Sequence, residues 1–235
     1  MNPLVFIVSA PSGSGKSTLL HGLLSSVERL HFSISYTTRP PRGSEQSGRE
    51  YFFIARQEFE RMIQAGEFLE HADVFGNYYG TAKRFLEEAR QRGEDLLLDI
   101  DVQGAAQIKQ KLPQAITIFV LPPSREELER RLRRRSQAEN ALDPQVLQRR
   151  LRAAAKEIEN WSNYNYIVVN DQLDPAIERL RDIVVAERRL RSGAKLSAGE
   201  EALVAEARKS LQANMRPQVA PILASFAGAA VPGRS

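Results

Sequence analysis

The chain has 235 residues, of which 42% are hydrophobic, so it can bury a substantial core as one large domain or as a domain with insertions. It contains no cysteine, which excludes disulfide bonds, zinc sites built on thiolates and a cysteine nucleophile. The formal net charge of +4 suits a polyanionic partner, but it does not choose among nucleic acid, a membrane surface and nucleotide phosphates.

Short apolar runs alternate along the chain with segments that have helical spacing. This alternation predicts a parallel sheet covered by helices. In chain order we expect a strand at 4–8, a helix from 16, short strands at 34–37 and 51–55, a helix at 57–65, a strand at 95–100, a helix at 103–111, a strand at 116–121, a helix from 125, a strand at 166–169 and a helix at 175–190.

Two segments have a different character. Residues 33–92, with short strands, one helix and an apparent turn at "NYYG", look like a subdomain inserted into the sheet. After residue 191, the segment 203–211 has helical spacing, but 213–235 is rich in Ala, Pro and Gly. Because such a composition buries little surface, we expect a short helix followed by a disordered tail.

No segment resembles a targeting or membrane signal. The longest apolar runs are far shorter than the roughly 20 residues that a membrane span needs. The first residues contain neither a charged region nor a small-residue cleavage site. The three histidines lack metal-ligand spacing, so a surface or packing role is expected for each. We expect a cytoplasmic protein.

The string "VSAPSGSGKST" follows the first predicted strand and precedes a helix, which is the context of a phosphate-binding loop. Gly13 and Gly15 permit successive N–H groups to point at one anion, and the helix adds its positive N-terminal end. Lys16 would reach the β and γ phosphates, and Ser17 would offer its hydroxyl to Mg²⁺. The usual pattern begins with Gly where this chain has Ala10, a position at the strand exit. The competing interpretation is an ordinary Gly/Ser turn before a helix.

A second strand ends in two carboxylates. In "DLLLDID", Asp99 and Asp101 lie two residues apart and would project from the same face of the strand. Asp99, which follows three leucines, is the candidate for holding Mg²⁺ directly or through water. Asp101 would face the phosphoryl acceptor. Alternatively, either carboxylate could cap the helix that begins at Val102, an interpretation that suits Asp101 better than Asp99.

Arginines cluster in two places. In "ISYTTRPPRGSEQSGREYFF", two prolines restrict the backbone between Arg39 and Arg42, which pre-positions both guanidinium groups for one anion. A surface loop with scattered charges is the alternative there. In "SREELERRLRRRSQ", three glutamates lie four residues before an arginine, which predicts the pairs Glu126–Arg130, Glu127–Arg131 and Glu129–Arg133. Arg134 and Arg135 have arginines at that offset, so they are the better candidates for phosphate.

Taken with "EYFF", "FLEHADVFGNYYGT" and "LLLDIDVQG", these motifs resemble the guanylate kinase family over about residues 3–191. The resemblance implies an α/β fold of the P-loop NTPase type, with three layers, a parallel sheet core, an inserted GMP-binding subdomain and a helical lid. It implies a guanylate kinase-like domain at 1–191, composed of a core at 1–32, 93–124 and 160–191, an insert at 33–92 and a lid at about 125–159. Residues 192–235 would form a C-terminal extension.

The resemblance also implies roles for individual residues. The expected ATP-binding residues are Ser12, Gly13, Ser14, Gly15, Lys16, Ser17, Thr18 and Asn170. The expected GMP-binding residues are Ser35, Arg39, Arg42, Tyr51, Glu70, Tyr79, Thr81 and Asp101. The expected catalytic residues are Lys16, Arg135 and Arg150, with Ser17 and Asp99 at Mg²⁺.

Several of these roles have a specific chemical content. Glu70 would accept both N1–H and the 2-amino group of guanine, and adenine lacks these two donors. Tyr79 would donate to the GMP phosphate, aimed by a turn at Gly76 and Gly80, while Tyr78 would pack. Asn170 would lie near adenine or cap the helix after Asp171.

The lid departs from the family pattern, because the usual glycines beside its first arginine are Arg134 and Ser136 here. On the next helix, Arg149 is the alternative to Arg150.

The implied reaction is direct in-line transfer from MgATP to GMP or dGMP, in purine nucleotide metabolism. The implied partners are these nucleotides, without nucleic acid or membrane, and a homo-oligomer is left open. Three other functions compete: a guanylate-kinase-like module that binds phosphopeptides, a kinase for another small molecule, and a nucleic-acid binder. Phosphopeptide-binding modules lack a working phosphate loop, which this chain has. Glu70 and Ser35 argue against a kinase for another small molecule. A nucleic-acid binder would not need the phosphate loop.

Overall fold

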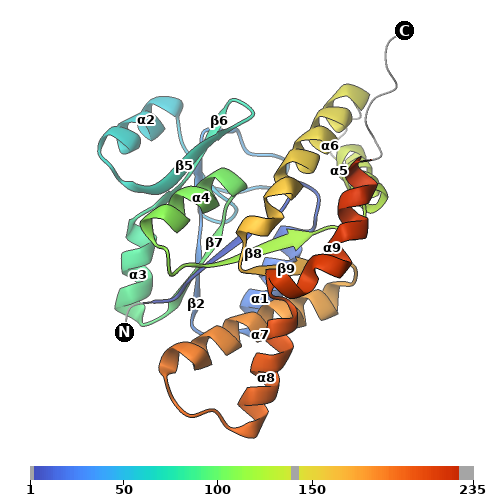
Figure 1. Cartoon of the computed structure of the whole chain (residues 1–235). Helices are drawn as coiled ribbons and strands as arrows, with labels where there is room; N and C mark the ends of the chain where they lie inside the picture. Colours follow the sequence, from blue (N-terminus) through green and yellow to red (C-terminus); the bar gives the residue numbers. More distant parts are fainter. Residues whose placement is uncertain (1–2, 139–142, 228–235) are drawn as a thin grey trace. The chain divides into compact units, whose positions relative to one another are not determined.

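The computed structural model describes residues 3–138 and 143–227, and these form two compact α/β units (Figure 1). The first unit lies within residues 1–9 and 27–117, and the second within 10–26 and 118–235. The predicted fold class, with parallel strands and several helices, is confirmed.

The first unit contains three parallel strands in the order β2-β7-β1. They are β2 (Leu30–Ser33), β7 (Asp95–Asp99) and β1 (Val5–Ser9). Three leucines, Leu96–Leu98, are completely buried, which is typical of a parallel strand covered on both faces. Two helices of this unit are α3 (Arg84–Arg92) and α4 (Val102–Lys111). The predicted strands at 4–8 and 95–100 and the predicted helix at 103–111 are therefore confirmed to within one residue at each end.

A second sheet lies entirely inside the predicted insert. Its strand order is β4-β3-β6-β5, with β4 (Phe52–Phe53), β3 (Tyr36–Thr37), β6 (Asn77–Ala82) and β5 (Phe68–Val74). Helix α2 (Arg56–Gln64) contributes Phe59 and Met62 to an aromatic-rich cluster with Phe68, and Tyr36 and Tyr78 pack against it. This cluster gives the small sheet its own hydrophobic core.

The prediction of a turn at "NYYG" is wrong. Residues 77–82 form β6, which pairs with β3 on one side and β5 on the other. The turn comes just before, where Phe75 (φ 55°) and Gly76 (φ 81°) adopt left-handed backbone conformations. Gly80 does not turn the chain: a Cβ there would lie 2.9 Å from Phe68 Cδ1 and 3.0 Å from Phe59 Cζ. Glycine is needed at 80 because the aromatic cluster leaves no room for a side chain.

The second unit contains a parallel pair of strands and six α-helices among the described residues. Its elements are α1 (Lys16–Ser26), β8 (Ile116–Leu121), α5 (Arg125–Ala138), α6 (Pro144–Ile158), the 3₁₀ helix η1 (Glu159–Asn163), β9 (Tyr166–Val169), α7 (Leu173–Ser192), α8 (Ala198–Lys209) and α9 (Gln212–Ala227). Helices α1 and α7 approach closely, since a Cβ at Gly22 would lie 2.3 Å from Ile177 Cδ1. The predicted strands at 116–121 and 166–169 are confirmed.

The expected disordered tail is wrong for residues 213–227, which belong to α9. Met215, Val219 and Ile222 are buried and recur at helical spacing, so this helix has an apolar face despite its many alanines and two prolines. The preceding helix, α8, begins with a capping box formed by Ser197 and Glu200. Residues 228–235 of the predicted tail lie outside the described residues.

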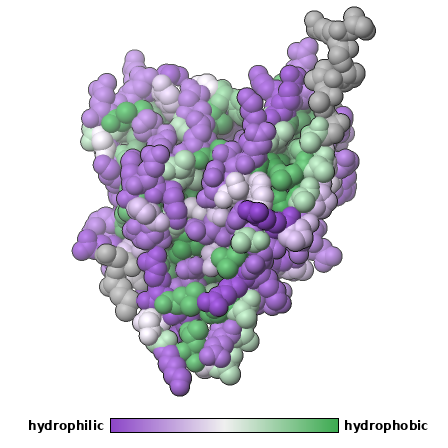
Figure 2. Space-filling model, in the orientation of Figure 1, coloured by the Kyte–Doolittle hydropathy of each residue, from purple (hydrophilic) through white to green (hydrophobic). Residues whose placement is uncertain are grey.

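Hydrophilic side chains cover most of the face drawn in Figure 2, with hydrophobic residues between them. Within 3–138 and 143–227, no helix is both long enough and apolar enough to cross a membrane.

Candidate active site

The predicted phosphate loop has the backbone that anion binding requires. Gly13 (φ 91°) and Gly15 (φ 85°) are both left-handed, and Ser14 N–H donates to Pro11 O at 3.1 Å. Helix α1 begins directly after the loop, and Lys16 is its first residue. A helix N-terminus and glycines with left-handed backbones therefore lie together, as in known phosphate-binding sites. Ser12, Ser17 and Thr18 are exposed and Lys16 is half-buried.

The loop is held from behind by two side chains of the second unit. The carbonyl oxygen of Ser14 accepts from Asn170 Nδ2 at 2.7 Å and from Arg131 Nη1 at 3.1 Å. Arg131 Nη2 also donates to Asn170 O at 3.0 Å. A Cβ at Gly15 would lie 2.5 Å from Asn170 Nδ2. Glycine is therefore needed at 15 both for the left-handed backbone and because a side chain would clash with Asn170.

Asn170 does not cap a helix, and that alternative is wrong. Helix α7 has Gln172 at its N-cap, and the Asn170 side chain is turned to the phosphate loop instead. Asn170 is 6% exposed. Its predicted contact with adenine stays a prediction, whereas its hydrogen bond to the loop gives it a positioning role.

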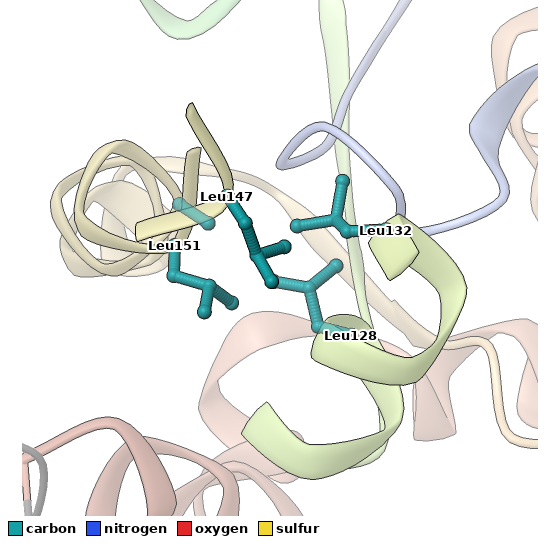
Figure 3. Packing of buried hydrophobic residues seen from close by; sticks show 5 residues of the cluster. Leu128, Leu132, Leu147 and Leu151 are labelled. Carbon is teal, nitrogen blue, oxygen red and sulfur yellow. The ribbon is translucent and has the colours of Figure 1, made fainter. Parts of the chain in front are cut away.

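The two helices of the predicted lid pack through leucines. Figure 3 shows Leu128 and Leu132 of α5 pointing toward Leu147 and Leu151 of α6. Phe226 of α9 packs against the same cluster, and Ser225 Oγ accepts from Arg125 N at 3.0 Å at the start of α5. The C-terminal extension therefore supports the base of the lid helices.

The predicted phosphate-binding arginines lie on these two helices. Arg135 is exposed on α5, Arg149 is exposed on α6, and Arg150 is half-buried beside it. These positions do not choose between Arg149 and Arg150, and both roles stay predictions. Residues 139–142 of the connecting segment lie outside the described residues.

The predicted ion pairs of α5 are confirmed in two of three cases. Arg131 Nε lies 2.7 Å from Glu127 Oε1, and Arg133 Nη2 lies 2.5 Å from Glu129 Oε1. The Glu126–Arg130 pair is wrong, because Arg130 pairs with Glu127, one turn away at the i, i+3 position. Glu127 thus pairs with both Arg130 and Arg131.

In the first unit, three of the four residues expected at the GMP phosphate meet. Arg39 is 6% exposed, and its Nε donates to Tyr79 Oη at 3.2 Å. Its guanidinium carbon lies 5.4 Å from the centre of the Tyr51 ring, and the Tyr51 and Tyr79 rings make an edge contact at 5.7 Å. The fourth residue, Arg42, is exposed in the same loop. Since Tyr79 Oη accepts from Arg39, its own proton is available for another acceptor.

Tyr78 packs, as expected. Its ring stacks on Phe59, with the ring centres 5.3 Å apart. The guanidinium carbon of Arg56 lies 4.2 Å from the centre of the Tyr78 ring, and Arg56 Nη2 donates to Tyr78 Oη at 2.6 Å.

Sequence reasoning missed Glu45. Its carboxylate accepts from Arg39 Nη2 at 3.0 Å and from the backbone N–H of Arg42 at 2.8 Å. Glu45 therefore holds both arginines of the loop, one by its side chain and one by its backbone. The only signal in the sequence was an acidic residue three positions after Arg42, which many surface loops share.

Glu70 lies on β5 opposite Thr81 of β6, and both are buried. Glu70 is 2% exposed, and within the described part of the chain neither Glu70 Oε1 nor Thr81 Oγ1 has a hydrogen-bond partner. Burial raises the pKa of Glu70 to about 7; the neighbouring Thr81 opposes this rise, and the charge of Asp101 adds to it. A buried carboxylate oxygen without a partner is unfavourable, so Oε1 is suited to a ligand that brings hydrogen-bond donors.

The two aspartates of "DLLLDID" have different environments. Asp99 ends β7 and lies close enough to Tyr51 to affect it: burial raises the pKa of the Tyr51 phenol, and the Asp99 carboxylate adds to this rise. Asp101 is the N-cap of α4, and its Oδ1 accepts from Gly104 N at 2.9 Å. The expectation that both project from one strand face is wrong, since the strand ends at Asp99, and the capping alternative holds for Asp101. Ser35 lies in the short segment that joins β2 to β3, and its side chain is buried.

Comparison with known proteins decides the family. The family model described as guanylate kinase matches residues 2–187. A guanylate kinase of Koribacter versatilis is 56% identical over 99% of both chains, and the Escherichia coli K12 guanylate kinase is 47% identical over 78% of this chain and 88% of its own. The chain belongs to the guanylate kinase family. A crystal structure of guanylate kinase from Anaplasma phagocytophilum matches with a TM-score of 0.62 at 35% identity, covering 79% of this chain and 86% of that one.

The match to the Koribacter versatilis guanylate kinase extends over the C-terminal extension, whereas the family model ends at residue 187. The segment that forms α8 and α9 therefore lies beyond the part matched by the family model, and the Koribacter versatilis relative shares it in sequence.

Proposed function

We propose that this guanylate kinase family member transfers the γ-phosphoryl group of ATP to GMP, and to dGMP, giving ADP and the corresponding diphosphate. The family assignment supports the enzyme activity and its two substrates. We further propose which side chains bind each of the two nucleotides, from the positions and contacts of those side chains.

The observation that carries it is the buried Oε1 atom of Glu70, which has no hydrogen-bond partner among the described residues. Guanine presents N1–H and the 2-amino group side by side, so both can donate to one carboxylate. Adenine would leave the buried oxygen unsatisfied, and this difference is the basis of selectivity for guanine. Thr81 Oγ1 is also buried and without a partner among the described residues, so it would complete the contacts with the base. Asp101 and Ser35 are the other residues predicted to bind GMP on this side.

The phosphate of GMP would bind to Arg39, Arg42, Tyr51 and Tyr79. Three of these already touch each other, and Arg39 is paired with Glu45. A phosphate that approaches Arg39 can share or replace this pairing, because a guanidinium group offers five donors. Tyr51 keeps its proton because burial raises its pKa, so it can act as a donor.

ATP would bind to the phosphate loop through Ser12 to Thr18. Lys16 would stabilise charge on the transferred group, and lid arginines Arg135 and Arg150 would assist. A hydroxyl and a carboxylate are oxygen ligands that Mg²⁺ prefers, so Ser17 and Asp99 are the residues that would hold the ion. When bound, that ion would neutralise charge on the phosphates. The described residues include no group of three or more His, Asp or Glu side chains that could hold a metal by themselves.

The catalytic function is favoured over a phosphopeptide-binding module. Both glycines of the phosphate loop have left-handed backbones, Lys16 follows them, and Asn170 with Arg131 supports the loop. A module that only binds peptides needs none of these features. A place in purine metabolism, a cytoplasmic location, the absence of nucleic-acid and membrane partners, and the oligomeric state stay predictions.

The test is ADP formation from MgATP with GMP, dGMP, AMP, CMP and UMP offered separately, with wild type and with Glu70→Gln. We expect strong preference for the two guanine nucleotides in wild type. In Glu70→Gln the preference should fall by roughly 10- to 100-fold, the effect of losing hydrogen bonds to a charged group. If no monophosphate stimulates ADP formation, the kinase proposal is wrong.

The matched control is Glu201→Gln, which makes the same change at an exposed position on α8. It should keep the wild-type preference. Equal preference in all three proteins would contradict the role given to Glu70 while leaving the kinase activity intact.

A further inference from the structure

Helix α4 is fixed against β5 by hydrogen bonds that do not involve Glu70. The Gln107 side chain donates to His71 O at 2.7 Å and accepts from His71 N at 3.3 Å. One turn later, Lys111 Nζ donates to Leu69 O at 2.5 Å. The strand residues on both sides of Glu70 are thus tied to the helix, and neither backbone can retreat from the other at low cost.

Gly104 lies in the first turn of this helix and is buried against Glu70. A Cβ added at Gly104 would lie 2.5 Å from Glu70 Oε2, 3.0 Å from Glu70 Cδ and 3.3 Å from Asp101 Oδ1. Real Cβ atoms do not approach other atoms to 2.5 Å, so the carboxylate occupies the space that any side chain at 104 would need.

Helix formation does not explain this glycine. Its backbone is helical, without a left-handed φ, so alanine could adopt the same conformation and is the better helix former. Asp101 caps the turn by accepting from the Gly104 backbone N–H, an interaction that alanine would keep. What alanine would change is the position of the Glu70 carboxylate.

We propose that Gly104 is a specificity-determining position of this enzyme, because its missing side chain leaves room for Glu70 Oε2 against α4 and so keeps the unpaired Oε1 in place for the base. The inference rests on the proposed function of Glu70. Gly104 touches no substrate atom in this account: it is a positioning residue that acts through the carboxylate. Since two donors of guanine must meet one carboxylate, even a small rotation of that group weakens both hydrogen bonds.

The experiment compares Gly104→Ala with wild type in kcat/KM for GMP and for IMP, which lacks the 2-amino group. We expect the GMP/IMP ratio to fall by about 10-fold, the loss of one hydrogen bond to a charged acceptor. The KM for ATP should stay within about twofold of wild type. The matched control is Gly199→Ala in α8, where a Cβ would meet no atom within 4 Å, and its ratio should be unchanged.

A double-mutant cycle separates positioning from general damage. In a Glu70→Gln background, Gly104→Ala should change the GMP/IMP ratio far less than it does in wild type, because the group through which it acts is already altered. An unchanged ratio in Gly104→Ala alone, or equal effects in both backgrounds, would overturn the inference.

If Gly104→Ala fails to fold, Glu70→Ala is added, which removes the carboxylate that the new methyl group would strike. Restored folding supports the close contact, and failure to restore it overturns the inference. A wild-type protein that does not phosphorylate GMP would instead contradict the proposed function, so the two failures are distinguishable.

Discussion

The phosphate loop and the surroundings of Glu70 differ in how their polar groups are paired, and in the proposed function they would recognise their ligands by opposite means. In the loop, polar groups behind the backbone are paired: Ser14 O accepts from both Asn170 and Arg131, and two left-handed glycines set the conformation. Around Glu70, two buried side-chain oxygens have no partner among the described residues. The loop would thus be pre-organised for any polyphosphate, whereas Glu70 would be satisfied only by a base with the matching donors. Backbone geometry gives affinity in the first case, and an unpaired side chain gives selectivity in the second.

Lys16→Ala tests whether the loop also supplies catalysis. We expect kcat to fall by roughly 10³-fold, the effect of removing a group that stabilises transition-state charge. Turnover at saturating ATP and GMP is the measurement, with Lys195→Ala as a control at an exposed position. GMP affinity, measured by calorimetry, should be unchanged. A parallel loss of GMP affinity would contradict the separation of the two regions.

Glu70→Gln should make the ligand-free protein more stable at neutral pH. The pKa of Glu70 is raised from 4.5 to about 7, so the folded state holds its proton more tightly than the unfolded state. This proton binding contributes about 3 kcal/mol to the free energy of unfolding of wild type. The contribution is fully present below pH 4.5 and is lost as the pH rises through 7.

Denaturant unfolding from pH 4.5 to pH 8 measures this difference. The Glu70→Gln protein should gain on wild type as the pH rises, while Glu201→Gln should follow wild type. If the wild-type and Glu70→Gln curves stay parallel, Glu70 does not carry the cost of an unpaired buried charge.

Gly15→Ala should damage the loop alone. The left-handed backbone costs about 1–2 kcal/mol for alanine, and its methyl group would approach Asn170 Nδ2 to 2.5 Å. We expect the KM for ATP to rise about 10-fold and the KM for GMP to stay constant. Gly193→Ala is the control, because its φ is also left-handed (67°) but its Cβ would meet nothing within 4 Å. Equal effects from both substitutions would mean that contact with Asn170 is unimportant.

Tyr79→Phe should give the smallest change, on the GMP side only. It removes the hydroxyl that accepts from Arg39 and leaves the ring contact with Tyr51. Loss of one hydrogen bond is worth about 1 kcal/mol, so the KM for GMP should rise about fivefold. Steady-state kinetics with each substrate varied in turn would show this, and a rise in the KM for ATP instead would contradict the assignment.

Local sequence signals predicted the buried parallel strands and the phosphate loop well. The mostly apolar run 116–121 is typical of a buried strand and is buried throughout. A glycine-rich loop between a strand and a helix has few alternatives. They failed where distant parts of the chain decide the structure. Gly76 and Gly80, on either side of "NYY", suggested a turn, but pairing with β3 and β5 makes 77–82 a strand. Glycine is needed at 80 because the aromatic cluster leaves no room for a side chain.

The C-terminal helix was missed although its signal was present. Met215, Val219 and Ile222 are spaced by four and three residues, as on one face of a helix, but the surrounding Ala, Pro and Gly outweighed that pattern. At the site, the family resemblance supplied Glu70, but only the structure shows that its Oε1 is unpaired and that Gly104 leaves it room. Glu45 and Arg131 were missed in their site roles because side-chain contacts across loops leave no periodic trace in a sequence.

The most direct test of the account is the affinity for GMP between pH 6 and pH 8, in wild type and in Glu70→Gln, by calorimetry. The phosphate of GMP titrates near pH 6 and affects both proteins alike, so their difference reports on Glu70. In the proposed function guanine would bind the ionised carboxylate, whose pKa is about 7 in the free protein. Wild type should therefore lose about 10-fold more affinity than the variant between pH 8 and pH 6. Parallel curves for the two proteins would contradict the claim that an unpaired carboxylate at position 70 recognises the base.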